Sequence, residues 1–367
     1  MALPTVVVRL LTAFTVAPAG CWRTIAALVA VATLSACSSA GPGRLRHDRI
    51  NYNDALSGSW KQQALLNIVR LRYADIPEFL DVTSVIGSYT LEGQLNAGAS
   101  GGFGQGFAQG TYTDRPTITY TPLIGDKFTK SLLRPIPPAA IFALIQAGYP
   151  VDRVLQFTVR AINGVYNRSA EQGRSRPADP QFYALLDALR RIQLADALAM
   201  RLEPHGNDEK TVVFFRRDVP EEVAADLRFV AAILQINLQA PELQLTYSAL
   251  ATTRTEIALL TRSMLEIYAE IASTIEVPEG DVREGRAAPT PALPSTPHPR
   301  DLPMVQVLSG DQQPDDAFVA VRYRKHWFWM DDRDLASKFA FSSLMLFASL
   351  AETGVSPQAP LVTIPAN

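Results

Sequence analysis

Residues 211–236 read TVVFFRRDVPEEVAADLRFVAAILQI. The first six, 211–216, are rich in Val and Phe, which is typical of a strand. Residues 218–222 match the start of a helix, because proline fits the first helical turn and carboxylates are stabilised at the positive end of the helix dipole. The apolar residues that follow predict a helix ending near Ile236. A strand followed directly by a helix indicates a fold that mixes both structures.

The same start and stop signals recur elsewhere. Prolines 137–138 precede the apolar run AAIFALIQAGYP, in which Gly148 and Pro150 mark the helix end, and Pro180 precedes QFYALLDALRRI. A helix is also predicted at 54–73, because its apolar residues recur at spacings of three and four. The stripe is formed by Trp60, Ala64, Ile68 and Leu71, widened by Leu65 and Val69.

Ser263 and Glu266 fit a capping box that opens a helix to about Thr274. A second box at 253–256 would instead make one longer helix. Strand-like runs lie between the helices, and the order is neither all-α nor all-β. We therefore predict an α+β fold with mixed sheets, several short helices and a C-terminal strand-helix-strand segment. Besides 211–216, the runs are 155–159, 243–247, 256–261 and 317–330.

Composition narrows the class of protein. Hydrophobic residues form 47% of the 367 residues and charged residues 19%, a balance that lets a globular chain bury a core. The formal net charge is -2, so no strong field attracts nucleic acid, and we expect no such partner. The two cysteines, Cys21 and Cys37, lie close to the N-terminus, which leaves the remaining chain without thiol chemistry.

The cysteines lie in and after an apolar segment. Residues 24–36, TIAALVAVATLSA, follow Arg9 and Arg23, which is the layout of a signal peptide, and the run is too short for a stable membrane anchor. It closes with Leu34, Ser35, Ala36 and Cys37. These four residues resemble the lipobox of bacterial lipoproteins, in which the three residues before the cysteine are read by the lipoprotein signal peptidase.

The resemblance implies that residues 1–36 are a signal peptide and that Cys37 carries acyl chains, which hold the protein on a membrane. Ser38 follows the cysteine, which favours an outer-membrane location facing the periplasm. The small and basic residues 37–50 are expected to form a flexible tether. Two other interpretations remain: a secretory signal cut elsewhere, or a buried helix that happens to end in cysteine.

A glycine-rich segment, 83–121, predicts a long β-hairpin or a surface loop. In its first arm Tyr89 alternates in phase with Leu91, Leu95 and other apolar residues, against polar residues at the intervening positions. The return arm is dense in glycine, and Phe103 and Phe107 fall on a common face. These aromatic residues are candidate interaction sites. Each arm exceeds the length that a membrane strand requires.

The helix at 54–73 ends in a basic run, in which Arg70 and Arg72 are expected to face solvent or to pair with Asp75 and Glu78. We expect an α+β main domain at 51–275. A proline-dense region, 276–313, then predicts an extended linker or mobile loop, because it has too few apolar residues to bury a core.

The C-terminal segment, 314–367, is expected to contain a helix at 332–350 and a final strand at 360–365, and should pack back on the main domain. Its strand contains candidate binding residues His326, Trp327 and Trp329. A carbohydrate platform or metal site is one interpretation. The other, which we favour, is structural: Asp331 or Asp332 caps the next helix, one tryptophan is buried and the other lies at a domain edge. No metal and no cofactor are predicted.

Three stretches, LLNIVRLRYADIPEFLDV, PTITYTPLIGDKF and VRYRKHWFWMDDRDLASKF, resemble proteobacterial lipoproteins of uncharacterised function. That resemblance implies no activity. We therefore expect a non-enzymatic, lipid-anchored envelope protein with a structural, assembly or binding role, whose partner is another envelope protein or a second copy. The alternatives are an envelope hydrolase or glycan-binding enzyme, and an oligomeric export pore that uses the 83–121 hairpin.

Overall fold

The computed structural model describes most of the chain and divides it into two compact units. The first unit comprises 1–59, 80–122 and 359–367, and the second comprises 60–79 and 123–358. The fold is α+β, as predicted. The described residues are 6–13, 42–86, 89–100, 103–114, 117–171, 174–205, 208–292 and 297–351.

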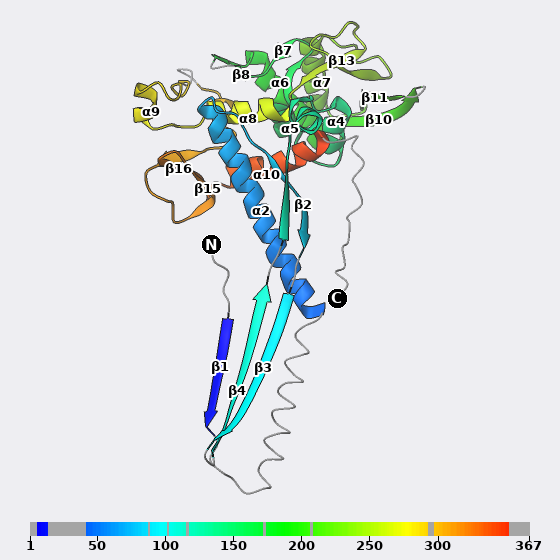
Figure 1. Ribbon diagram of the computed structural model, residues 1–367. Helices are drawn as coiled ribbons and strands as arrows, with labels where there is room; N and C mark the ends of the chain where they lie inside the picture. The colour runs from blue at the N-terminus through cyan, green and yellow to red at the C-terminus, as the bar shows by residue number, and fades with distance from the viewer. Residues whose placement is uncertain are drawn as a thin grey trace. The chain divides into compact units, whose positions relative to one another are not determined.

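The first unit contains the predicted hairpin. Strands β3 (Tyr89–Ser100) and β4 (Phe103–Asp114) pair antiparallel along their full lengths, and Figure 1 shows them as two long neighbouring arrows. Strands β2 (Leu80–Ile86) and β5 (Thr117–Pro122) also pair antiparallel. A further strand, β1 (Val6–Ala13), pairs antiparallel with the other edge of β4. The segment thus forms strands and not a loop.

The second unit is built on a six-stranded mixed sheet in the order β10-β11-β12-β13-β6-β7. All neighbours are antiparallel except β12 and β13, which run parallel. Two small sheets, β14-β16-β15 and β8-β9, complete it. The strands are β6 (Val159–Ile162), β7 (Val165–Tyr166), β8 (Ser169–Glu171), β9 (Arg174–Arg176), β10 (Leu198–His205), β11 (Asp208–Phe215), β12 (Leu243–Tyr247), β13 (Glu256–Thr261), β14 (Leu308–Gly310), β15 (Ala317–Tyr323) and β16 (His326–Asp331).

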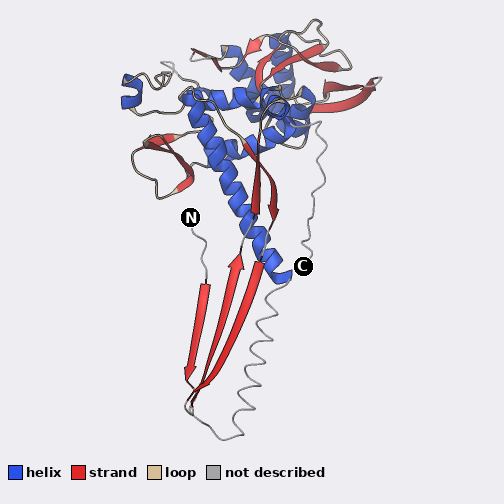
Figure 2. Ribbon diagram, viewed as in Figure 1, coloured by secondary structure: helices blue, strands red, loops and turns tan. Residues whose placement is uncertain are grey.

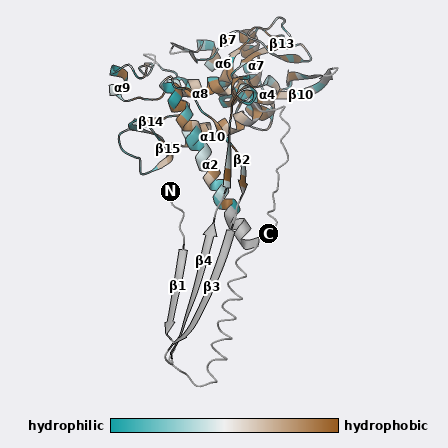
Figure 3. Cartoon of the chain, viewed as in Figure 1, coloured by the Kyte–Doolittle hydropathy of each residue, from teal (hydrophilic) through white to brown (hydrophobic). Residues whose placement is uncertain are grey.

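Helices pack with these sheets around one hydrophobic core, whose largest fully buried side chains include Phe182, Phe328 and Phe341. Figure 2 separates helices from strands, and Figure 3 shows hydrophobic residues recurring along the helices of this unit. None of the helices within the described ranges is both long and apolar enough to cross a membrane. The helices are α2 (Pro42–Arg72), α3 (Asp126–Phe128), a π-helical turn (Thr129–Leu133), α4 (Pro138–Gln146), α5 (Val151–Thr158), α6 (Pro180–Leu194), α7 (Glu221–Leu234), α8 (Met264–Ser273), α9 (Glu279–Arg283), a 3-10 turn (Pro299–Asp301) and α10 (Leu335–Ala351).

The helix start signals are confirmed. Helices α4 and α6 carry proline in their first turn, α7 begins directly after Pro220, and Gly148 adopts a positive φ of 98° just past α4. The capping box of α8 is present in both directions between Ser263 and Glu266. The alternative box at 253–256 is wrong, because Glu256 begins strand β13.

Two local predictions are wrong. Residues 155–159 form the end of α5 and only the start of β6. Taken alone, this run of five residues omits Asp152 and Arg153, which share a helix face with Gln156, so the helical spacing is not visible in it. Helix α2 begins at Pro42 and not near residue 54, so most of the predicted tether 37–50 is helical. Its early turns have no apolar stripe, but proline is compatible with the first helical turn.

The proline-dense region 276–313 is not an extended linker. It forms α9 and a 3-10 turn within the second unit, and Val305 and Val307 are buried, with 1% and 3% of their surface exposed. We call residues 276–307 the proline-rich segment. Side chains far away in the sequence bind the backbone of its described residues, 276–292 and 297–307.

The C-terminal region differs in detail from the predicted strand-helix-strand. Residues 317–330 form two antiparallel strands, β15 and β16, because the chain reverses at Arg324, whose φ is +53°. Helix α10 follows, as predicted for 332–350. The final predicted strand, at 360–365, lies outside the described residues.

Candidate functional site

The predicted site residues His326, Trp327 and Trp329 all lie on β16, the central strand of its sheet. Both tryptophans are half-buried, whereas Phe328 and Met330 between and beyond them are fully buried. The expectation of one buried and one edge tryptophan is therefore wrong. Residues two apart on a strand share a face, so both tryptophans lie on the face opposite the core.

Trp329 lies across the neighbouring strand β14. A Cβ atom added to Gly310 would come within 3.3 Å of the Trp329 ring, so the ring lies directly over this glycine. Trp329 therefore packs on the neighbouring strand of its own sheet.

His326 lies in a chain of polar groups. Its Nδ1 is 2.8 Å from Asp311 Oδ1, and its Nε2 is 3.9 Å from Oδ2 of Asp281. Tyr73 donates its phenol hydrogen to the same Asp281 oxygen at 2.7 Å, and Arg286 Nη1 lies 3.3 Å from the other. Asp281 is 4% exposed, so these contacts compensate a buried carboxylate.

The phenol of Tyr73 is held in its protonated form. Burial, and then the hydrogen bond and charge of Asp281, raise the pKa of Tyr73 well above its usual value. The ring also contacts Tyr323 and Phe328, with centroids 5.3 Å and 6.0 Å away, and the Arg324 guanidinium lies 4.9 Å from its centroid. Tyr73 therefore acts as a fixed donor that joins α2 to α9 and to the β15-β16 hairpin.

The acidic residues after β16 have a capping role, but not the one predicted. The helix begins at Leu335, so Asp334 and not Asp331 or Asp332 accepts the Ser337 backbone N–H, at 3.0 Å. This bond and the bond from the Ser337 hydroxyl lower the pKa of Asp334. Asp332 instead pairs with Lys338 at 2.6 Å. No three His, Cys, Asp or Glu residues are grouped to hold a metal ion anywhere in the described chain.

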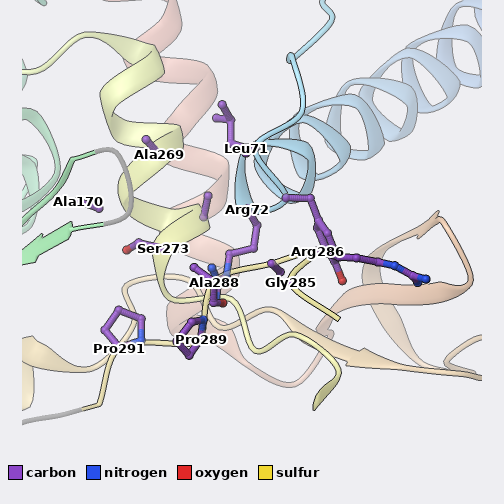
Figure 4. A pocket seen from close by; sticks show the side chains of 14 residues that line it. Leu71, Arg72, Ala170, Ala269, Ser273, Gly285, Arg286, Ala288, Pro289 and Pro291 are labelled. Atoms are coloured by element: carbon purple, nitrogen blue, oxygen red, sulfur yellow. The ribbon is translucent and has the colours of Figure 1, made fainter. Parts of the chain in front are cut away.

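Next to Tyr73, the proline-rich segment borders a cavity of about 500 Å³. Figure 4 shows Leu71 and Arg72 of α2 on one side, Ala269 and Ser273 of α8 on another, and Gly285 to Pro291 crossing below. Most of the lining is alanine, proline and glycine. The cavity therefore offers an apolar wall made of small residues.

Arg72 attaches the proline-rich segment to the rest of the second unit, which we call the body. Its Nε donates to the Ile275 carbonyl at 3.1 Å, and its Nη2 donates to the Ala288 carbonyl at 2.6 Å and to Thr290 Oγ1 at 3.3 Å. Thr290 in turn donates to the Ile275 carbonyl. Arg72 is 9% exposed, so the expectation that it faces solvent is wrong. The expected surface pair forms instead between Arg70 and Glu78, at 3.2 Å.

A second attachment is organised by the buried carboxylate of Glu270 on α8. Arg168 Nε donates to it at 2.6 Å, and the backbone N–H of Ala170 donates at 2.9 Å. The guanidinium of Arg262 lies 3.8 Å away. Arg168 also donates to the Asp301 carbonyl at 2.8 Å, which ties the segment to this buried ion pair.

The charges around Glu270 are deeply buried. Arg262 is 2% exposed and Glu270 is 2% exposed, and Arg262 also donates to the carbonyls of Gln156 and Phe157 at 3.2 Å. Burial lowers the pKa of Arg262, while the charge of Glu270 opposes this effect. Such an arrangement is stable only while every member keeps its partner.

The same end of the segment is held by further contacts. Arg300 pairs with Asp152 at 3.0 Å and with Asp187, and Tyr183 donates to Asp301 at 3.0 Å. Burial, together with this hydrogen bond, raises the pKa of Tyr183. Two more cavities border this end, of about 630 and 580 Å³, and they share Leu302, Pro303 and Gln306.

Sequence reasoning missed these holding residues. Isolated arginines and glutamates are usually solvated, and their partners lie roughly a hundred or more positions away in the chain. The only local indication of a buried charge was Glu270, which lies within the apolar stretch of α8. The arrangement binds and orients a segment, and its cavities can receive apolar groups.

In the hairpin, the register places the candidate aromatic positions. Residues directly opposite each other share a face of a two-stranded ribbon. Tyr89 is opposite Asp114, while Phe103 is opposite Ser100 and Phe107 is opposite Asn96. Phe103 and Phe107 therefore share a face, as expected, but it is the face of the polar positions and not that of Tyr89.

The lipobox residues 34–37 lie outside the described residues. No protein-family model, curated protein or solved structure matches the chain. The physical arrangement of its own residues is therefore the basis for a functional proposal.

Proposed function

We propose that the protein is a lipid-anchored envelope protein with a structural, assembly or binding role. Cys37 carries the acyl chains, and the folded units lie on the periplasmic side of the outer membrane. The lipobox at residues 34–37, preceded by an apolar run, supports the anchor. The anchor restricts the protein to a surface, which favours encounters with other envelope components.

The observation that carries the binding role is the way the proline-rich segment is held. Arg72 fixes it at Ala288 and Thr290, and Arg168 fixes it at Asp301. Residues 288–292 are exposed and line cavities on the body. Because Arg72 holds these residues in place before binding, a partner would lose little conformational entropy by binding them. We propose that an envelope protein docks apolar side chains here.

The anchor is tested by Cys37→Ser, with Cys21→Ser as the matched control. We expect Cys37→Ser to keep its leader and to lose incorporation of labelled fatty acid and membrane association. Cys21→Ser should be processed and labelled like the unaltered chain. Unchanged processing and labelling of Cys37→Ser would refute the anchor.

The binding role is tested by cross-linking in intact envelopes. Arg72→Met should reduce the yield of the cross-linked partner species several-fold, because it releases the segment. Arg70→Met, on the same helix, changes an exposed pair and should leave the yield unchanged. Equal yields for both variants would contradict a role of the held segment.

A second candidate is an oligomeric export pore, favoured by the register of the hairpin. The pairs Thr90 with Thr113, Glu92 with Thr111 and Gln94 with Gln109 place polar positions together. The opposite face combines Leu91 with Tyr112 and Leu95 with Ala108. This separation holds over 90–95 and 108–113, whereas Phe103 and Phe107 fall among the polar positions nearer the turn. A stretch of ribbon with one polar and one apolar face suits a shared wall between water and an apolar phase. Size measurement of the protein extracted in detergent tests this candidate, which a monomer would refute.

A further inference from the structure

Strands β3 and β4 of the first unit form a two-stranded ribbon, and its two edges differ in whether another strand pairs with them. In the sheet order β1-β4-β3, strand β4 is central and β3 ends the sheet among the described strands. The outer edge of β4 is occupied by β1 over eight residue pairs, from Val6 opposite Tyr112 to Ala13 opposite Gln105. Backbone groups on an open edge attract another strand, so the occupant of each edge matters.

Strand β1, which pairs with the edge of β4, belongs to residues 1–36, the signal peptide that the lipobox predicts to be cleaved off. Strand β1 covers residues 6–13, and cleavage before Cys37 would separate it from β4. This step rests on the proposed function. After cleavage, the ribbon would have an open edge on β4 as well as on β3, each formed by a strand of twelve residues.

The two open edges suit each other. Strands β1 and β3 both run antiparallel to β4, so β3 of a second copy can enter the place of β1 in the same direction. The two strands have equal length, and in-register pairing between copies would repeat the pairing of polar positions 90, 92 and 94 with 113, 111 and 109 that is already present within the ribbon. Pairing β3 to β4 also satisfies both edges of every copy, whereas symmetric β4 to β4 pairing leaves each β3 edge open.

We propose that the processed protein self-associates through its ribbon, with β3 of one copy pairing antiparallel to β4 of the next in the place that β1 occupies before cleavage. The leader strand thus protects the assembly edge until the chain has been processed.

Single cysteines on the two strands test the geometry. Gln94 and Gln109 are opposite each other in the ribbon, and Gln109 is opposite Arg9 of β1. Two differently tagged chains, one with Gln94→Cys and one with Gln109→Cys, are co-expressed in a Cys21→Ser background and treated in envelopes with a short thiol cross-linker. We expect the mixed-tag dimer to exceed either same-tag dimer several-fold. A Gln109→Cys same-tag dimer in excess, or no dimer, would overturn the proposal.

The role of β1 is tested with the unprocessed chain. Cys37→Ser, which retains β1, should lower the mixed-tag yield several-fold, and a further Leu10→Pro should restore it by removing a β1 backbone donor opposite Ala108. Equal cross-linking of retained and cleaved chains would overturn the protective role. Fatty-acid labelling of the chains that keep Cys37 separates the outcomes: labelled, cleaved protein without cross-links refutes self-association, and unlabelled protein refutes the anchor.

Discussion

The proline-rich segment and the hairpin ribbon are held by different kinds of contact: bonds from distant side chains in the segment, and a backbone ladder between adjacent strands in the ribbon. The segment has a composition that predicts a linker, yet it is fixed by Arg72, Arg168 and Asp152 from distant parts of the chain. The ribbon has a regular alternation of residue types, and its order lies in a ladder between adjacent strands. Composition therefore indicates how much apolar area a segment can bury, but it does not reveal the hydrogen-bond donors that other segments provide.

This contrast predicts that a single substitution of a buried charged residue in the body lowers the stability of segments that are far away in the sequence. The largest effect is expected for Glu270→Gln, which leaves Arg262 and part of Arg168 without a countercharge in the interior. Loss of one partner of a buried pair costs about 3–5 kcal/mol of unfolding free energy. Chemical denaturation measures this loss.

Glu221→Gln is the matched control for Glu270→Gln. Glu221 pairs with Arg228 at 2.6 Å, but its side chain is 83% exposed, so the change should cost less than about 1 kcal/mol. Similar losses for the two variants would mean that the buried charges around Glu270 do not stabilise the body as described.

A smaller effect is expected for Arg72→Met, which keeps an apolar stem but removes the donors to Ile275 and Ala288. Hydrogen bonds from a charged group contribute about 1.5–3 kcal/mol, so we expect a loss of about 2 kcal/mol. Hydrogen exchange should quicken at residues 287–292 and remain slow in α8. Arg70→Met is the control, and equal protection of the segment in both variants would contradict the attachment.

Asp334→Ala should have a moderate effect, because it removes the N-cap of α10, at a cost of about 1 kcal/mol. The folded-state pKa of Asp334 is lowered from its ordinary value of 3.8, so the ionised form is the stabilising one. Its contribution is complete above that value and is lost as the pH falls through the folded pKa. Asp334→Asn should keep most of the cap and lose this acid dependence. Parallel stability curves against pH for Asn and Asp would be inconsistent with this assignment.

The smallest effect on the body is expected from a change in the ribbon. Thr111→Pro removes a backbone donor in β4, where Thr111 faces Glu92 on one side and Val7 on the other. Amide exchange in 89–114 should quicken strongly. Because the ribbon belongs to a separate compact unit, the free energy of unfolding of the body should change by less than about 0.5 kcal/mol. A larger change would show that the two units are energetically coupled.

Most of the fold could be predicted from local patterns. Proline and glycine positions located α4, α6 and α7, and the capping box located α8. The failures have physical reasons: α5 is only eight residues long and its polar face begins before the strand-like run 155–159, and the early turns of α2 have no apolar face. A local pattern reveals a helix only where enough of both faces falls within the stretch of sequence considered.

The candidate site was less accessible from the sequence. His326 was a candidate binding residue, but Asp281 and Tyr73, which lie in the same chain of polar groups, are distant in sequence and carry no motif. Asp334 was missed as the cap because the helix begins a turn later than its first polar residue suggested. The spacing of residues along the sequence does not reveal which distant residues will pair with a charged group.

The strand register of the ribbon has a consequence for how copies can slide past one another. Moving β3 by one residue along a neighbouring β4 would take polar positions 90, 92 and 94 to the other face relative to positions 113, 111 and 109, whereas moving it by two residues keeps them on the same face. The offset between neighbouring copies is thus confined to increments of two residues, or about 7 Å at the usual rise of a strand. An assembly built from this ribbon would therefore choose among a few discrete staggers, and not slip continuously.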